Sequence, residues 1–170
     1  LTIGYKQTIS QPYIVARMTE HLISHTSKRG KVLNQVLEIG SGCGYQSAVL
    51  SYFANDVFAV ERIKPLVSKS RENLSDLKIR NVIVKHADGF YGWEEDLKFD
   101  GIICAAAPRQ YPEELLELLE IGGKLVIPVG LEGQQKLYVI TKKSDTESEE
   151  MIHEEVAFVP MLPGVSNGEV

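Results

Sequence analysis

Cysteine is scarce in this chain of 170 residues, which holds only Cys43 and Cys104. Two distant cysteines offer none of the spacings of a cysteine-based metal centre, and they cannot supply the disulfide framework of a small secreted domain. Cys43 lies in a glycine-rich turn, and Cys104 lies in a stretch predicted to be a buried strand. The cysteine content therefore favours a reducing compartment, and we expect a cytoplasmic location.

Long apolar runs and basic clusters are also missing. No run approaches the roughly 20 apolar residues of a membrane span, and no signal peptide opens the chain. The longest lysine–arginine clusters are the pairs Lys28-Arg29 and Lys142-Lys143, and the net charge is −5. Because a nucleic-acid backbone requires a basic stripe, we expect neither a nucleic acid nor a membrane as partner.

The composition that remains is that of an ordinary globular protein, with 44% hydrophobic and 24% charged residues and no internal repeats. A chain of this length buries a substantial core without disulfides. We therefore expect a single domain over residues 1–170 and a monomer. The chain begins at Leu1, without a methionine, inside what reads as a working segment, and we expect an amino-terminal region to be missing.

The most informative stretch is Val36 to Tyr45, which reads Val-Leu-Glu-Ile-Gly-Ser-Gly-Cys-Gly-Tyr. A buried strand that ends at alternate glycines and runs into a helix brings backbone close to a ligand at the carboxyl edge of a sheet. Dinucleotide sites use Gly-x-Gly-x-x-Gly, whereas here Gly44 comes one residue early. Glu38 precedes Gly40 by two residues, where a carboxylate can meet an amine or a cation.

This combination favours the aminocarboxypropyl and sulfonium groups of S-adenosyl-L-methionine over a pyrophosphate. We expect backbone contacts to the cofactor from Gly40, Ser41, Gly42 and Gly44. The alternative is a tight strand-to-helix turn without a ligand. A second feature supports a ligand, because the next strand, 57–60, ends in Glu61, where an acidic side chain holds ribose hydroxyls. The alternative for Glu61 is an ion pair with Arg62 or Lys64.

Strands and helices alternate over the first two thirds of the chain, which predicts a doubly wound, mostly parallel α/β sheet of Rossmann-like type. The predicted helices cover residues 12–25, 46–54, 65–77 and 111–120, the last of them stopped by Gly122-Gly123. The predicted strands of this part cover residues 36–39, 57–61, 81–85 and 99–105.

The last third of the chain breaks this alternation. Strands are predicted at 124–129, 135–141 and 156–159 with no helix between them, and short connections join only antiparallel strands. We therefore expect the sheet to end in an antiparallel hairpin, as in S-adenosylmethionine methyltransferases. The acidic stretch 144–150 is predicted to be a solvated loop.

Several segments together carry a resemblance to a known family. They include Gln7-Thr8-Ile9-Ser10, the glycine turn, Ala105-Ala106-Ala107-Pro108 and Val126-Ile127-Pro128-Val129-Gly130. Over essentially its whole length the chain resembles the bacterial type of protein-L-isoaspartate O-methyltransferase, a class I S-adenosylmethionine-dependent methyltransferase. Two departures are visible: the family's Gly-Asp-Gly is Ala87-Asp88-Gly89 here, and the family's helical segment ahead of Gly4 is absent.

The resemblance implies a repair reaction in which a methyl group passes from S-adenosyl-L-methionine to the α-carboxylate of isoaspartyl residues in damaged proteins and peptides. It implies substrate contacts by Thr8, Ile9 and Ser10, with the Ser10 hydroxyl as the catalytic group that orients the carboxylate. The alternative for Ser10 is a capping role on the helix that starts at Pro12.

The resemblance also implies that Asp88 accepts from the adenine amino group and that Gly89 keeps the loop tight. The alternative for Asp88 is a turn residue. Small residues at Ala106, Ala107 and Pro108 leave room for a substrate backbone, or they form a crowded loop.

His21 and His25 are four residues apart on one predicted helix face, which would suit a metal pair. No third ligand follows them, so we expect a polar helix face and no metal site. Two other functions stay open at this point. One is a methyltransferase that acts on another small substrate, and the other is a non-catalytic S-adenosylmethionine-binding module that recognises peptides.

Overall fold

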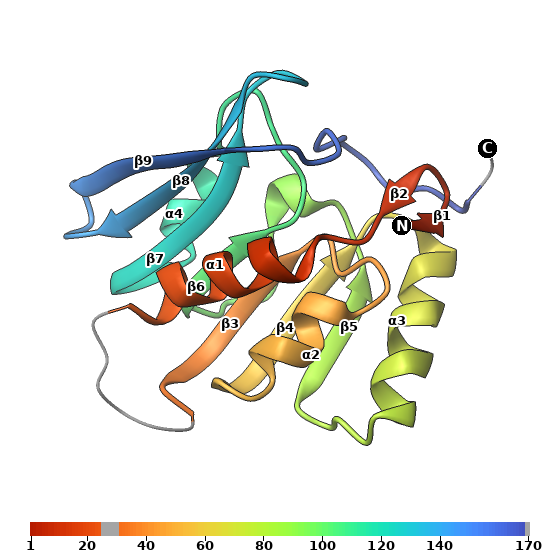
Figure 1. Cartoon of the computed structure of the whole chain (residues 1–170). Coiled ribbons are helices and arrows are strands. Elements are labelled where there is room, and N and C mark those ends of the chain that lie inside the picture. Colours follow the sequence, from red (N-terminus) through yellow and green to blue (C-terminus); the bar gives the residue numbers. More distant parts are fainter. Residues whose placement is uncertain (25–30, 169–170) are drawn as a thin grey trace.

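The computed structural model describes residues 1–24 and 31–168. Its centre is a seven-stranded sheet in the order β5-β4-β3-β6-β7-β8-β9 (Figure 1), with a separate two-stranded hairpin, β1-β2, near the amino terminus. The strands are β1 Thr2–Gly4, β2 Gln7–Thr8, β3 Leu33–Ile39, β4 Ala54–Glu61, β5 Val82–His86, β6 Phe99–Cys104, β7 Leu119–Val129, β8 Gln135–Lys142 and β9 Ser148–Val156. The helices are α1 Pro12–Ile23, α2 Tyr45–Leu50, α3 Lys64–Asp76 and α4 Glu114–Glu117, with a 3₁₀ turn η1 at Gly89–Tyr91.

The expected sheet is confirmed. Strands β3 to β7 are parallel, and β8 and β9 are added antiparallel to them. The strand order reverses at β3, which has β4 on one side and β6 on the other. Loops leave the sheet in opposite directions at such a point, and they open a crevice at the carboxyl ends of the strands.

Alternate residues of the strands bury both faces of the sheet. Val36, Ile103 and Val126 pack with Met18 and Leu22 of α1 on one face. Their strand neighbours, among them Leu37, Ile102 and Leu125, pack on the other face with Leu115 of α4 and with Trp93. Figure 1 shows α1, α2 and α3 on one side of the sheet and α4 on the other. The doubly wound arrangement follows from this two-sided apolar pattern.

Two predicted helices are shorter than expected. The helix predicted over 46–54 is α2, which ends at Leu50, and Ala54 already begins β4. The helix predicted over 111–120 is a single turn, α4, and β7 begins at Leu119, which pairs with Phe99. Gly122 has the expected positive φ of 86°, but it lies in an irregularity of β7 and not at a helix end. Strand pairing therefore determines the structure of this region, although the spacing of its leucines is typical of a helix.

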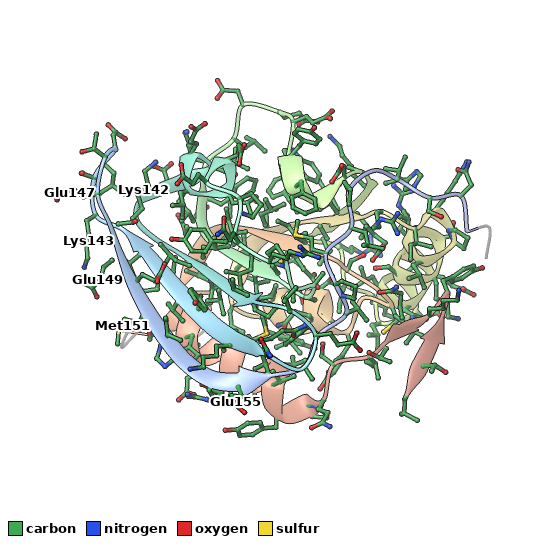
Figure 2. The ribbon with its side chains drawn as sticks, turned by 90° about the horizontal axis from the view of Figure 1, so that it is seen from above. Lys142, Lys143, Glu147, Glu149, Met151 and Glu155 are labelled. Atoms are coloured by element: carbon green, nitrogen blue, oxygen red, sulfur yellow. The ribbon has the colours of Figure 1, made fainter. Side chains whose placement is uncertain are left out.

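The predicted acidic loop is partly wrong, because residues 148–150 belong to β9. Figure 2 shows Glu149, Met151 and Glu155 along this outer strand. An edge strand tolerates charge, since one of its sides faces solvent, and the Lys143 Nζ lies 3.5 Å from a carboxylate oxygen of Glu149. The strand predicted at 156–159 is therefore displaced, and β9 ends at Val156.

Helix α1 ends at Ile23, so the predicted extension to His25 is not observed, and His25 lies outside the described residues. Strand β7 begins at Leu119, five residues before the strand predicted at 124–129, and the remaining predicted elements agree with the structure within three residues at each end. No helix among residues 1–24 and 31–168 combines the length and the apolar character that a membrane crossing requires.

Candidate functional site

A cavity opens at the carboxyl ends of β3 and β4, where the strand order reverses. Its floor is the end of β3 and the glycine turn, and its sides come from Val60 to Ile63, from Ala87 and Gly89, and from Ala105 and Ala106. The segment Gln7–Ser10 and the segment Val159–Leu162 complete the wall. Segments that are far apart in the sequence thus meet over the glycine turn.

The glycine turn is shaped by backbone conformations that side chains disfavour. Gly42 has a φ of +52°, and a Cβ atom placed there would lie 3.1 Å from the Ile3 Cδ1 atom of the covering hairpin. Gly44 has a φ of +90° and precedes α2, and a Cβ there would lie 2.9 Å from Ser70 Oγ. Gly40 and Gly42 line the cavity, whereas Gly44 is needed for packing against α3 and does not line it.

Glu38 is fully buried in the floor of the cavity. The Ser47 hydroxyl donates to its Oε2 atom, and Oε1 has no hydrogen-bond partner among the described residues. Burial raises the pKa of the Glu38 carboxyl to about 8. Ser41 is also buried, and its Oγ atom likewise lacks a partner within the described part of the chain.

Two unpartnered polar atoms in a buried position are costly unless a ligand satisfies them. An ammonium group beside Glu38 would supply a hydrogen bond and would favour the ionised carboxylate. The residues in the floor therefore fit the aminocarboxypropyl group of S-adenosylmethionine.

Glu61, at the end of β4, is 6% exposed and lines the cavity. Its Oε2 atom accepts from the Gly42 amide at 2.9 Å, and its Oε1 atom accepts from the Ile63 amide at 3.0 Å. The ion pair considered for Glu61 is not formed, and Arg62 Nε donates to the Gly164 carbonyl. The Glu61 carboxylate thus holds the glycine turn in place, and it lies in the cavity wall.

Ser10 lies between β2 and α1, is half-buried and lines the cavity together with Thr8 and Ile9. The capping alternative is wrong, because the residue at the helix N-cap is Gln11 and no side chain caps this helix end. The Ser10 hydroxyl is therefore free of a helix-capping duty.

Asp88 does not line the cavity, although Gly89 beside it does. Its Oδ1 atom accepts from the Phe90 amide at 2.9 Å, and its Oδ2 atom accepts from the Gly164 amide at 2.6 Å. The turn role considered for Asp88 is thus present, and the carboxylate also anchors the carboxyl-terminal segment. Gly89 is required by space, since a Cβ there would lie 2.5 Å from Ile39 Cγ2.

The segment Ala105–Pro108 has two roles, one in lining the cavity and one in supporting its wall. Ala105 and Ala106 line the cavity, whereas Ala107 and Pro108 are buried outside it. The Ala107 amide donates to the Val159 carbonyl at 2.8 Å, and its carbonyl accepts from the Met161 amide at 2.9 Å. Ala107 therefore holds the carboxyl-terminal wall of the cavity in place.

Sequence reasoning missed several residues of the wall, namely Ile3, Gln7, Met161 and Leu162. Gln7 lies within the segment Gln7–Ser10 that carries the family resemblance, and this resemblance is the signal that could have placed it at the site. The residues of the amino-terminal and carboxyl-terminal segments are far apart in the sequence, so no local pattern indicates that they line one cavity.

The geometry agrees with comparisons to known proteins. The sequence model of the protein-L-isoaspartate(D-aspartate) O-methyltransferase family matches residues 1–166. A protein of Methylobacillus flagellatus named protein-L-isoaspartate O-methyltransferase is 51% identical over 169 residues, which is 98% of this chain and 73% of the relative. A protein of the same name from Azoarcus sp. is 52% identical over 164 residues, covering 96% of this chain and 73% of that protein.

Solved structures give the same result. A putative protein-L-isoaspartate O-methyltransferase from Plasmodium falciparum, in complex with S-adenosyl-L-homocysteine, superimposes with a TM-score of 0.75 at 31% identity and covers 95% of this chain and 79% of its own. Another structure named protein-L-isoaspartate O-methyltransferase has a TM-score of 0.78 at 29% identity and matches over 89% of this chain. This chain spans 47% of that longer protein.

Proposed function

The chain belongs to the protein-L-isoaspartate(D-aspartate) O-methyltransferase family, and from this premise we propose how its residues carry out the family's reaction. It is an S-adenosylmethionine-dependent methyltransferase that acts on the α-carboxylate of isoaspartyl residues in damaged proteins. The observation that carries the division of roles below is the cavity at the reversal of strand order, with two unpartnered buried polar atoms in its floor.

The cofactor end of the cavity is formed by the glycine turn and the ends of β3 and β4. Glu38 and Ser41 bind the amino-acid portion of the cofactor, Gly40 and Gly42 allow close approach of their backbone, and Glu61 accepts from ribose hydroxyls. Gly44 acts indirectly, by letting α2 and α3 pack behind the turn. Bound S-adenosylmethionine supplies an electrophilic methyl group on a sulfonium centre.

Asp88 acts on the adenine end of the cofactor. Its carboxylate is already engaged by the Phe90 and Gly164 amides, and it lies outside the cavity wall. We propose that the adenine amino group donates to a remaining lone pair of this carboxylate. Gly89, the next residue, lines the cavity.

The substrate end is formed by Thr8, Ile9, Ser10 and Ala106, which line the same cavity. An isoaspartyl carboxylate has an ordinary carboxyl pKa, so it is ionised at pH 7 and needs no general base. The protein's task is to align one carboxylate oxygen with the methyl carbon and to exclude water. The Ser10 hydroxyl donates to the carboxylate and fixes that alignment, and Ala107 and Pro108 support the wall behind it.

Replacement of Ser10 by alanine tests this division of roles. Ser10→Ala should lower the turnover of an isoaspartyl peptide on the order of 10²-fold, the usual loss for an orienting donor. Its affinity for S-adenosylhomocysteine should stay within about twofold of that of the original protein, and its melting temperature should not fall, because Ser10 does not cap α1. Kinetics at saturating cofactor and calorimetry measure the two effects separately.

Full turnover by a folded Ser10→Ala protein would remove Ser10 from the mechanism. If the unaltered protein binds S-adenosylhomocysteine but transfers no methyl group to the peptide, the chain is a non-catalytic binding module. Transfer to a different acceptor alone would favour a methyltransferase of another substrate class.

The partners and the location of the protein are further parts of the proposal. Isoaspartyl-containing proteins and peptides are the partners, and we propose a cytoplasmic monomer with no nucleic-acid partner. Cys43 and Cys104 are both free thiols, which suits a reducing compartment. The net charge of −5 does not favour binding to a phosphate backbone.

A further inference from the structure

Three side chains with metal-binding chemistry meet away from the cavity, where α1 lies against β9. They are His21, near the carboxyl end of α1, and His153 and Glu154 on β9. One ligand atom from each lies within 4.8 Å of the other two. None of the three residues lines the cofactor cavity, and none has a role in the reaction described above.

A bulge in the edge strand brings His153 and Glu154 together. Lys136 pairs with Glu155 and Tyr138 pairs with Ile152, so one residue of β8 lies opposite two residues of β9. Neighbours in a regular strand point to opposite faces, whereas a bulge turns an extra side chain toward the same face. His153 and Glu154 are both half-buried, while Ile152 and Glu155 on either side are exposed. Figure 2 shows Met151 and Glu155 along this outer strand.

His21 contributes an atom that the protein leaves without a partner. Its Nε2 is buried and has no hydrogen-bond partner among the described residues. Its ring lies with the centroid 4.2 Å from that of His153, at an angle of 43°. A buried imidazole nitrogen without a partner is costly, and a metal ion is one group that satisfies it.

The charges around the three residues suit a cation only in part. Arg17 Nε donates to Glu154 Oε1 at 3.0 Å, and Arg17 also pairs with Glu20. The guanidinium holds one oxygen of Glu154 and leaves the other oxygen able to turn toward the histidines. An outer hydrogen bond of this kind orients a metal-binding carboxylate.

We propose that His21, His153 and Glu154 form a binding site for a single transition-metal ion of the Zn²⁺ class, which ties α1 to the edge strand β9. Two imidazoles and a carboxylate are a ligand set that Zn²⁺ accepts, with water as the fourth ligand. Ligand atoms around one Zn²⁺ lie roughly 3.3 Å apart at the usual bond lengths. The ligand atoms lie within 4.8 Å of one another here, so metal binding would require rotations of these half-buried side chains that bring the atoms closer together.

The site would act on the structure and not on the chemistry. Helix α1 begins directly after the Ser10 segment, so a metal bond between α1 and β9 would fix the helix that positions this segment. Metal that binds the folded chain alone raises its thermal stability by mass action.

Calorimetric titration of Zn²⁺ into the purified, chelator-treated protein tests the proposal. We expect one equivalent to bind, the melting temperature to rise with added Zn²⁺, and Co²⁺ to give the visible absorption of a tetrahedral site. His153→Gln and Glu154→Gln should each weaken Zn²⁺ binding by about 10-fold or more and should abolish the rise in melting temperature. Glu155→Gln, next on the same strand and exposed, is the matched control and should bind as the unaltered protein does.

Circular dichroism and S-adenosylhomocysteine affinity establish that each variant is folded. The proposal is overturned if the unaltered protein binds no stoichiometric Zn²⁺, or if folded His153→Gln and Glu154→Gln bind it as tightly as Glu155→Gln does. Binding that is lost in Cys43→Ser and kept in His153→Gln would place the metal in the cofactor cavity and would also overturn it.

Discussion

At the scale of single residues, Glu38 is the position where sequence and environment conflict most. It is an acidic side chain in a buried parallel strand, and within the part of the chain that the structure describes Ser47 is its single hydrogen-bond donor. The empty protein avoids part of the cost by holding the carboxyl in its neutral form, since burial raises its pKa to about 8. A residue kept in such a position is expected to serve a ligand, because an apolar residue would be more stable there.

Glu38→Gln should therefore make the empty protein more stable at neutral pH. The folded protein holds the Glu38 proton up to about pH 8, whereas the unfolded chain releases it near pH 4.5. The free energy of unfolding consequently falls as the pH rises between these values, by at most about 1.4 kcal/mol per pH unit, and glutamine removes that fall. Urea unfolding from pH 5 to 8 should show the stability advantage of Glu38→Gln growing with pH, while exposed Glu149→Gln shows no such trend. A constant difference would show that Glu38 is ionised in the folded state.

Gly42 is the second residue whose identity the site requires. Gly42→Val should abolish S-adenosylhomocysteine binding, because the added carbon atoms lie at the cavity floor beneath Ile3. Gly133→Val is the matched control, since Gly133 also has a positive φ, of +78°, but has open space around it and lies away from the cavity. Both variants carry similar backbone strain, of roughly 1–2 kcal/mol. Equal calorimetric affinities of the two folded variants would contradict the cofactor assignment.

At the scale of elements, local signals predicted the parallel half of the sheet well and the antiparallel half less well. Strand β3, which ends at Ile39 just before the glycine turn, and helix α3 carry strong local patterns, namely that turn and a proline at the first helical turn. The helix expected over 111–120 is only the single turn α4, because Leu119 pairs with Phe99 and begins a strand. This pairing could not be predicted locally, since Phe99 belongs to another strand. The beginning of strand β9 was not predicted, because its acidic residues are typical of a loop. Residues 148–150 form a strand because they pair with β8.

The carboxyl-terminal segment after β9 is an element without regular structure that nonetheless forms one wall of the cavity. It is held by the backbone of Ala107 and by the carboxylate of Asp88. The sequence alone assigned Asp88 to the cofactor, and only the coordinates reveal its bond to Gly164. Asp88 therefore also helps to hold this wall of the cavity in place.

Asp88→Ala should lower the free energy of unfolding by about 1 kcal/mol, the usual loss for a capping carboxylate. It should also speed amide hydrogen exchange at Gly164 and Phe90, whose N–H groups lose their acceptor. Asp145→Ala, in the exposed turn between β8 and β9, is the control and should change neither quantity. Unaltered exchange at Gly164 in Asp88→Ala would show that the wall is held without this bond. A fall in cofactor affinity that accompanies intact exchange would instead support a direct adenine contact.

At the scale of the whole molecule, the site is a product of topology. The order β4-β3-β6 places the ends of three strands at one edge, and the two ends of the chain close the cavity above them. Glu38, Gly42 and Glu61 were predictable, because a strand, a glycine turn and the next strand are consecutive in the sequence. The contributions of Ile3 and Met161 were not predictable, because nothing local links residues at opposite ends of the chain.

The most direct test of the function is a methyl-transfer assay on two peptides of the same composition, one with an isoaspartyl residue and one with an ordinary aspartyl residue. The protein is incubated with S-adenosylmethionine that carries a labelled methyl group, and base-labile methyl esters are counted on each peptide. We expect label on the isoaspartyl peptide and none above background on its aspartyl twin, with no label on either peptide from Gly42→Val. Equal labelling of both peptides, or no labelling by a protein that binds S-adenosylhomocysteine, would contradict this expectation.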